Sequence, residues 1–145
     1  MTSHVETYSV LPAQDLQRAR RFYSDALGME PAEDMPAGLL FRTAGGAMIL
    51  IYETSFAGTN RATAIGLVTG SFDADVADLR AKGVKFEEYD LPGLKTENGV
   101  VVMEGAKGAW FKDTEGNILS LSEDLFSRRL RSQSQHQEDG SSDID

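Results

Sequence analysis

Few side chains in this sequence could carry out covalent or metal chemistry. Its 145 residues include no cysteine, and histidine occurs only at His4 and His136. This composition excludes disulfides, thiolate nucleophiles and cysteine-bound zinc. No histidine stands where it would pair with a serine nucleophile, and the chain contains neither a G-x-S-x-G elbow nor a phosphate-binding glycine loop. The usual signatures of hydrolases and nucleotide-binding enzymes are therefore missing.

Carboxylates are the remaining groups that could hold a metal, because oxygen ligands suit magnesium or calcium. No calcium-loop spacing is present, and in a chain with 23 acidic and 14 basic residues most carboxylates are expected to be solvated. We therefore expect no metal and no cofactor, and metal-free acid–base chemistry stays open as an alternative. The carboxylate candidates are Glu53, Glu87, Glu88, Asp90 and Glu104.

Charge and hydropathy limit the possible partners. The net charge of −9 repels phosphate backbones, so nucleic acid is not an expected partner. No stretch approaches the roughly 20 apolar residues of a membrane span, and residues 1–6 lack the basic and apolar parts of a secretion signal. We expect a cytoplasmic protein without membrane association.

The strands and helices that would position a site occur in two similar copies along the sequence. Each copy reads as a strand, an amphipathic helix that ends at a glycine, and a β-hairpin. A repeat of this kind predicts one structural module used twice, with a ligand bound between the copies. The first copy has a strand at residues 8–11, a helix over 15–27 and a hairpin within 38–53; the second has a strand at 64–68, a helix over 73–82 and a hairpin that ends by residue 123.

Capping residues bound both predicted helices. Asp15 and Asp73 are expected N-caps, and Gly28 and Gly83 are expected to end the helices in the left-handed conformation. The second copy is longer than the first because of residues 89–99, which have the composition of a loop. This loop could cover a ligand or could be a plain surface connection.

The C-terminal residues differ in composition from the rest. Residues 132–145 contain one aliphatic and no aromatic side chain, so we expect a disordered acidic tail. Residues 123–131 could form a short helix. The sequence thus predicts a single domain over residues 1–131, with modules at about 6–54 and 62–123.

Three segments resemble a known family. Residues 11–29 are similar to the opening strand and helix of the vicinal oxygen chelate superfamily, which includes glyoxalase I, bleomycin-resistance proteins and extradiol dioxygenases. Residues 109–119 resemble its closing hairpin, and residues 89–96 resemble a loop of its bacterial glyoxalase-like members. The resemblance implies an α+β fold of two βαβββ modules, whose mixed sheets curve as half-barrels around a cleft, and commonly a homodimer.

The same resemblance implies where a metal would be held. Enzymes of the superfamily usually bind a divalent ion through His, Glu or Gln on four strands. In this sequence those positions fall at Tyr8, Leu50, Ala64 and Ser120, none of which is a usual metal ligand. The expected metal site is therefore replaced by apolar and small side chains.

An apolar cleft is the expected result of these replacements. Small residues leave space, while tyrosine and tryptophan offer flat rings with a polar tip. Such a cleft suits an aromatic or hydrophobic small molecule, although the same side chains could instead fill a core. The expected ligand-binding residues are Tyr8, Leu50, Tyr52, Ala64, Gly66, Trp110 and Ser120.

The sequence therefore predicts a metal-free, glyoxalase-like protein that binds a small molecule, for example to sequester a drug or metabolite. One alternative is an enzyme of the superfamily, a lyase, isomerase or dioxygenase that acts on a small oxygenated compound. Another is an interaction module that works through its acidic tail. We expect a homodimer, because a second copy would cover the unpaired sheet edges.

Overall fold

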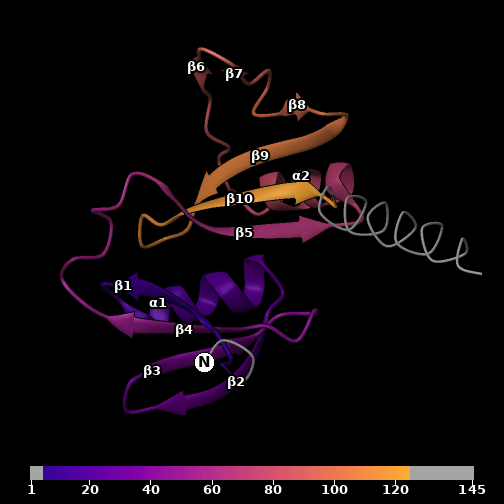
Figure 1. Cartoon of the computed structure of the whole chain (residues 1–145). Helices are drawn as coiled ribbons and strands as arrows, with labels where there is room; N and C mark the ends of the chain where they lie inside the picture. Colours follow the sequence, from indigo (N-terminus) through magenta and orange to yellow (C-terminus); the bar gives the residue numbers. More distant parts are fainter. Residues whose placement is uncertain (1–4, 125–145) are drawn as a thin grey trace, which may run out of the picture.

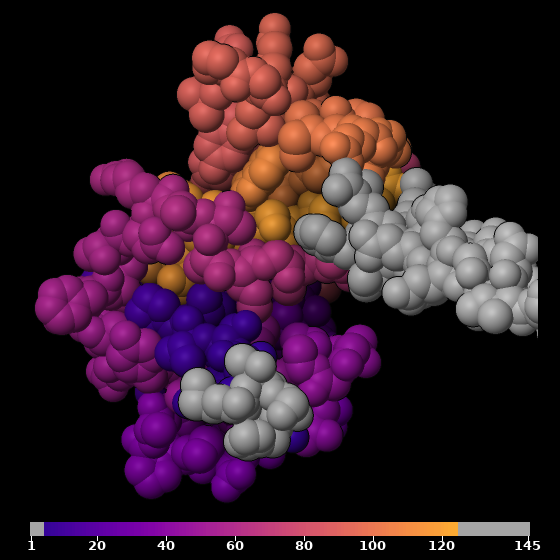
Figure 2. Space-filling view, in the orientation of Figure 1, coloured from indigo at the N-terminus to yellow at the C-terminus, as the bar shows by residue number. Residues whose placement is uncertain are grey.

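The structure is a computed structural model and describes residues 5–124. It contains two four-stranded sheets, each with a helix, which form two stacked lobes (Figures 1 and 2). The first module comprises β1 (Ser9–Ala13), α1 (Leu16–Arg21), the π-helical turn η2 (Phe22–Ala26), β2 (Glu30–Met35), β3 (Gly38–Arg42) and β4 (Met48–Glu53). The second comprises β5 (Thr63–Thr69), α2 (Phe72–Ala81), β6 (Asp90–Leu91), β7 (Leu94–Lys95), β8 (Val101–Met103), β9 (Ala106–Lys112) and β10 (Ile118–Glu123).

The strand order is the same in both sheets. The first sheet runs β1-β4-β3-β2 and the second runs β5-β10-β9-β8. In each, the first strand of the module pairs in parallel with the last, and the other pairs are antiparallel. The predicted fold class is therefore confirmed: two βαβββ modules form open, mixed sheets. Within residues 5–124, no helix is long and apolar enough to cross a membrane.

The first helix begins as predicted but changes its form. The Asp15 side chain accepts a hydrogen bond from the backbone N–H of Arg18 at 3.0 Å, which confirms the N-cap. The predicted continuous helix over residues 15–27 is an α-helix only to Arg21 and then widens into η2. Gly28 follows with a φ of +65°, as expected for a helix-ending glycine.

The predicted N-cap of the second helix is wrong. Helix α2 begins at Phe72 and has Ser71 at the cap position, so Asp73 lies inside its first turn. The reason is burial: Phe72, Val76 and Leu79 fall at helical spacing and are all buried, which places Phe72 on the core face of the helix. Gly83 ends this segment with a φ of +87°.

Two strand regions differ from the prediction. Strand β2 was not expected, because all six of its side chains are exposed and its sequence shows no apolar alternation. The predicted loop over residues 89–99 contains the two-stranded hairpin β6–β7, which projects from the second module (Figure 1). Tyr8 precedes β1 rather than lying within it. Residues 132–145, and most of the helix expected over 123–131, lie outside the described residues.

One apolar core joins the two modules on the helix side of both sheets. Aromatic rings cross the boundary: the centroids of Phe22, at the start of η2, and Phe111, in β9, are 6.4 Å apart. The opposite side of each sheet remains open to solvent. The most completely buried large side chains are Tyr23, Phe41, Phe111, Leu11, Ile49, Ile51 and Leu119.

Candidate ligand site

The sheet surfaces that face away from the core carry most of the predicted site residues. Burial alternates along β4, where Ile49 and Ile51 are buried while Leu50 is half-buried and Tyr52 is exposed. We call this outer surface the open face. It comprises Val10, Leu40, Leu50 and Tyr52 of the first sheet and Ala64, Gly66, Val68, Trp110, Ser120 and Ser122 of the second.

The open face of the first sheet is apolar and aromatic. Leu50 stands between Val10 of β1 and Leu40 of β3 in the strand register. Tyr8 is 63% exposed and Tyr52 is 38% exposed. Exposed rings and aliphatic side chains on one surface are typical of a site that binds an apolar partner.

Three residues form a row across strands β9, β10 and β5 on the open face of the second sheet. Ser120 pairs with Trp110 on one side and with Gly66 on the other, so a large ring stands beside two small residues. A Cβ atom placed on Gly66 would lie 3.2 Å from the Ser120 Oγ, which shows how close the two strands come there. We call the row Trp110, Ser120 and Gly66 the trough.

A second ring extends the wall of this trough. Tyr89, at the base of the β6–β7 hairpin, packs edge-on against Trp110 with centroids 5.5 Å apart and an interplanar angle of 76°. Burial, and secondarily the nearby Glu87 carboxylate, raises the pKa of Tyr89, so its hydroxyl stays protonated at neutral pH. Lys112 Nζ lies 3.9 Å from the Glu87 carboxylate. The trough therefore has an aromatic wall and polar groups at its rim.

The described residues do not fit a metal. Tyr8, Leu50, Ala64 and Ser120 occupy the positions where the family resemblance placed ligands, and none offers an imidazole or carboxylate. Within residues 5–124, no group of three His, Asp or Glu side chains gathers closely enough to hold an ion. His4 and His136 lie outside that range. The carboxylates named as candidates for magnesium or calcium are not assembled into a site.

Strand pairing brings the predicted site residues together within each sheet but not across the two sheets. No strand of the first sheet is hydrogen-bonded to a strand of the second in the described part of the chain. A cavity of about 750 Å³ does lie between the modules, yet on the helix side, and Gly66 is the one predicted residue that lines it.

The closing turn between β9 and β10 contains a polar cluster that the sequence analysis did not identify. Glu115 is buried there and accepts hydrogen bonds from the backbone N–H groups of Gln14 and Asp15 at 3.0 and 2.9 Å. Arg18 donates to the same carboxylate through Nε at 2.8 Å and Nη2 at 3.0 Å. Burial alone would raise the pKa of Glu115, but these donors and Thr114 outweigh it and lower the pKa to about 2.

Three further buried residues complete this cluster. The Tyr23 hydroxyl donates to the Asp113 carboxylate at 2.6 Å, and Asn117 Nδ2 donates to the same carboxylate at 2.8 Å. Asn117 Nδ2 also donates to the backbone oxygen of Pro12 in β1 at 2.9 Å. The closing turn of the second module is thus fastened to the first strand and helix of the first module, which fixes the orientation of the two open faces.

Comparison with known proteins agrees with this architecture. Residues 3–121 match the family model described as Glyoxalase/Bleomycin resistance protein/Dioxygenase superfamily. No curated protein sequence matches the chain significantly.

Solved structures share the fold at low sequence identity. The fosfomycin resistance protein FosX from Listeria monocytogenes has a TM-score of 0.64 and 18% identity, with 86% of this chain and 97% of that chain covered. The antibiotic binding protein TnmS3 from Streptomyces sp. CB03234 has a TM-score of 0.60 and 20% identity over 83% and 97%. Lactoylglutathione lyase from Agrobacterium tumefaciens has a TM-score of 0.62 and 18% identity over 83% and 93%. These likenesses concern the fold alone.

Proposed function

Because the chain belongs to the Glyoxalase/Bleomycin resistance protein/Dioxygenase superfamily, we propose that it binds a small aromatic or hydrophobic molecule without a metal. The trough on the second sheet carries this proposal. Its Trp110 ring stands beside the small residues Ser120 and Gly66, so a flat ligand can lie over the floor and pack against the ring. One structural neighbour, TnmS3, is an antibiotic binding protein, and sequestration of a drug or metabolite would need no further chemistry.

The first sheet supplies the other part of the proposed site. Tyr8, Leu50 and Tyr52 present apolar and aromatic surface, and Ala64 leaves space on β5 beside Gly66. Surfaces of this kind are seldom left in water. We therefore propose that a second copy of the chain covers the open faces and encloses the ligand, which makes the working form a homodimer.

An enzyme is the second candidate, and the polar rim of the trough favours it. The protonated Tyr89 hydroxyl and the Lys112–Glu87 pair could polarise or protonate an oxygenated substrate held against Trp110. A lyase or isomerase reaction would fit such groups. Mass spectrometry of the ligand after incubation with the protein for several hours distinguishes the two candidates. An unchanged mass supports the binding protein, and a new product supports the enzyme.

Two measurements test the proposal. Elemental analysis of the purified protein should find well under one transition metal per chain, and chelator treatment should leave its melting temperature unchanged. A library thermal-shift screen should find a compound that stabilises the chelated protein, because a ligand at 100 times its Kd adds about 2.7 kcal/mol of stability. Stoichiometric metal that is lost together with ligand binding would overturn the proposal.

A further inference from the structure

Strand β5 is unusual because its core-facing side chains are incompletely covered. The equivalent strand of the first module, β1, buries Leu11 and Ala13 to 2% and 0% exposure. On β5, Ile65, Leu67 and Thr69 are only half-buried. These three positions border the cavity of about 750 Å³ between the modules. Ile65 and Leu67 also pack against the edge of the core, so part of their surface contacts the core and part lines the cavity.

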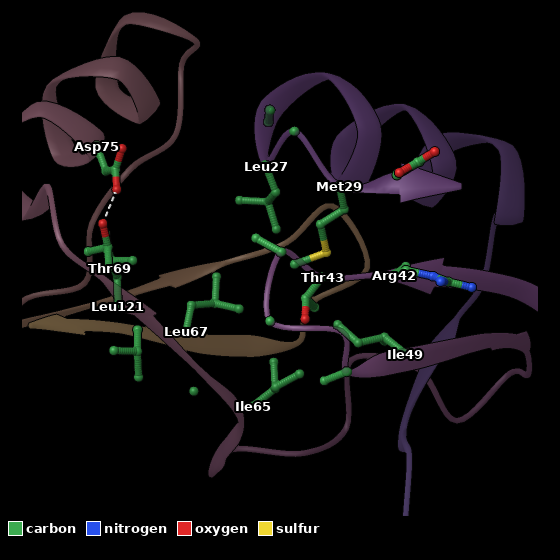
Figure 3. Close-up of a pocket in the computed structure, with 18 of the residues that line it drawn as sticks. Leu27, Met29, Arg42, Thr43, Ile49, Ile65, Leu67, Thr69, Asp75 and Leu121 are labelled. Atoms are coloured by element: carbon green, nitrogen blue, oxygen red, sulfur yellow. Dashed lines mark hydrogen bonds between the residues drawn. The ribbon is translucent and has the colours of Figure 1, made fainter. Parts of the chain in front are cut away.

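The walls of this cavity are mainly apolar (Figure 3). Leu27 and Met29 approach from the end of the first helical segment, Ile49 comes from β4, and Leu121 comes from β10. Ile65 and Leu67 complete the surface from β5. The volume lies within the range of about 300 to 1,000 Å³ that is typical of small-molecule sites.

The charged groups around the cavity are unbalanced. Three carboxylates, those of Glu30, Asp75 and Asp78, line it against the single guanidinium of Arg42. Arg42 extends away from the apolar walls in Figure 3, and Lys82 already pairs with Asp78 at 2.9 Å. The field inside the cavity therefore favours a positively charged group.

Asp75 is placed to receive that group. It comes from α2 and accepts a hydrogen bond from the Thr69 hydroxyl at one end of the cavity (Figure 3). Among the described residues, Thr69 is the one side chain that donates to this carboxylate. A carboxylate can accept from several donors, so Asp75 retains capacity to bind an ammonium group.

We propose that the helix-side cavity is a second binding site, which takes a small apolar amine. The hydrocarbon part packs against Leu27, Ile65 and Leu67, and the ammonium group donates to Asp75. Of the open-face residues, Gly66 and Val68 also line this cavity, but Ala64, Trp110 and Ser120 do not, so the two sites share strand β5 and have different walls. The proposal therefore stands or falls independently of the function proposed for the open face.

Isothermal titration of the full-length chain at pH 7 tests this proposal with three probes of one shape: 4-phenylbutylamine, 4-phenylbutan-1-ol and 4-phenylbutyrate. The amine should bind about tenfold or more tightly than the alcohol, since a charge-assisted hydrogen bond contributes more than a neutral one. The butyrate should bind most weakly. Asp75→Asn should reduce the affinity for the amine to that for the alcohol, because the amide oxygen still accepts from Thr69 while the charge is lost.

Two further variants locate the binding. Leu67→Trp adds bulk to the cavity and should abolish binding of both amine and alcohol. Val102→Trp, at an exposed position on β8 that belongs to neither the cavity wall nor the open face, is the matched control and should change neither affinity. Equal affinities for amine and alcohol in the wild type, an unchanged amine affinity in Asp75→Asn, or amine binding to a folded Leu67→Trp variant would each overturn the proposal. Binding that appears only after residues 125–145 are removed would also contradict it, because the chain itself would then occupy the cavity.

Discussion

Replacing Glu115 with glutamine should weaken the connection between the two modules in a pH-dependent way. The side chain of Glu115 is fully buried, whereas that of its partner Arg18 is 45% exposed. In Glu115→Gln the amide oxygen can still accept, but the amide NH2 faces other donors, so part of the hydrogen bonding from Gln14, Asp15 and Arg18 is lost.

The size of the effect follows from the pKa of Glu115, which is lowered to about 2 from an ordinary value of 4.5. At about 1.4 kcal/mol per pKa unit, ionised Glu115 stabilises the folded state by about 3 kcal/mol. Because the folded-state pKa is the lower one, this contribution is present in full above pH 4.5 and is lost as the pH falls towards 2. Glu115→Gln should therefore cost about 3 kcal/mol at pH 7 and much less near pH 2.

Urea denaturation followed by circular dichroism, at several pH values between 2 and 7, measures this difference. Glu33→Gln is the matched control, because Glu33 is exposed on β2 and its replacement should stay within about 0.5 kcal/mol of the wild type at every pH. A Glu115→Gln variant as stable as the wild type at pH 7 would refute the reasoning. A loss that does not change with pH would show that packing, and not the ionised carboxylate, stabilises the closing turn.

Three further predictions concern the fold, each measured by chemical denaturation. Gly116→Ala should lower the free energy of unfolding by about 1 to 3 kcal/mol more than Gly46→Ala. Both glycines have φ near +85°, so the backbone strain of the two variants is similar. A Cβ on Gly116 would lie 2.9 Å from the Gly58 Cα, whereas a Cβ on Gly46 has no neighbour within 4 Å. Equal losses would argue against the close contact. Tyr23→Phe should lower the free energy of unfolding by about 1.5 to 3 kcal/mol, since the Tyr23 hydroxyl donates to a buried carboxylate. An unchanged stability would mean that this hydrogen bond does not stabilise the fold. Deleting residues 132–145 should change stability by less than about 0.5 kcal/mol; a larger loss would show that the tail docks.

The repeated module could be predicted from sequence because its signals are local. Apolar periodicity and the cap at Asp15 identify the first helix, and glycine-containing turns between apolar runs identify the hairpins. Strand β2 carries no such signal: residues 30–35 are all exposed, and the strand forms because β3 offers a free edge with which to pair. Local patterns cannot reveal an element that depends on its neighbour.

The candidate site was predictable only in part for the same reason. Period-two alternation is enough to place Leu50 and Tyr52 on the open side of β4. The buried roles of Asp113 and Glu115 were not recognisable, because the segment from Asp113 to Asn117 has the composition of an ordinary surface turn. Their partners, Tyr23 and Arg18, lie about 90 to 100 positions earlier in the chain. The helix-side cavity likewise depends on how the modules pack.

The central claim, that a small molecule binds the open face without a metal, is tested most directly by one titration. A ligand from the thermal-shift screen is titrated into chelator-treated wild type and into Ala64→Leu, with the melting temperature of each protein recorded. Ala64 is exposed on β5, so its replacement adds bulk to the open face and not to the core. The account predicts that the wild type binds after chelation and that Ala64→Leu loses affinity at an unchanged melting temperature. A lower melting temperature with normal affinity, or binding that requires added metal, would contradict it.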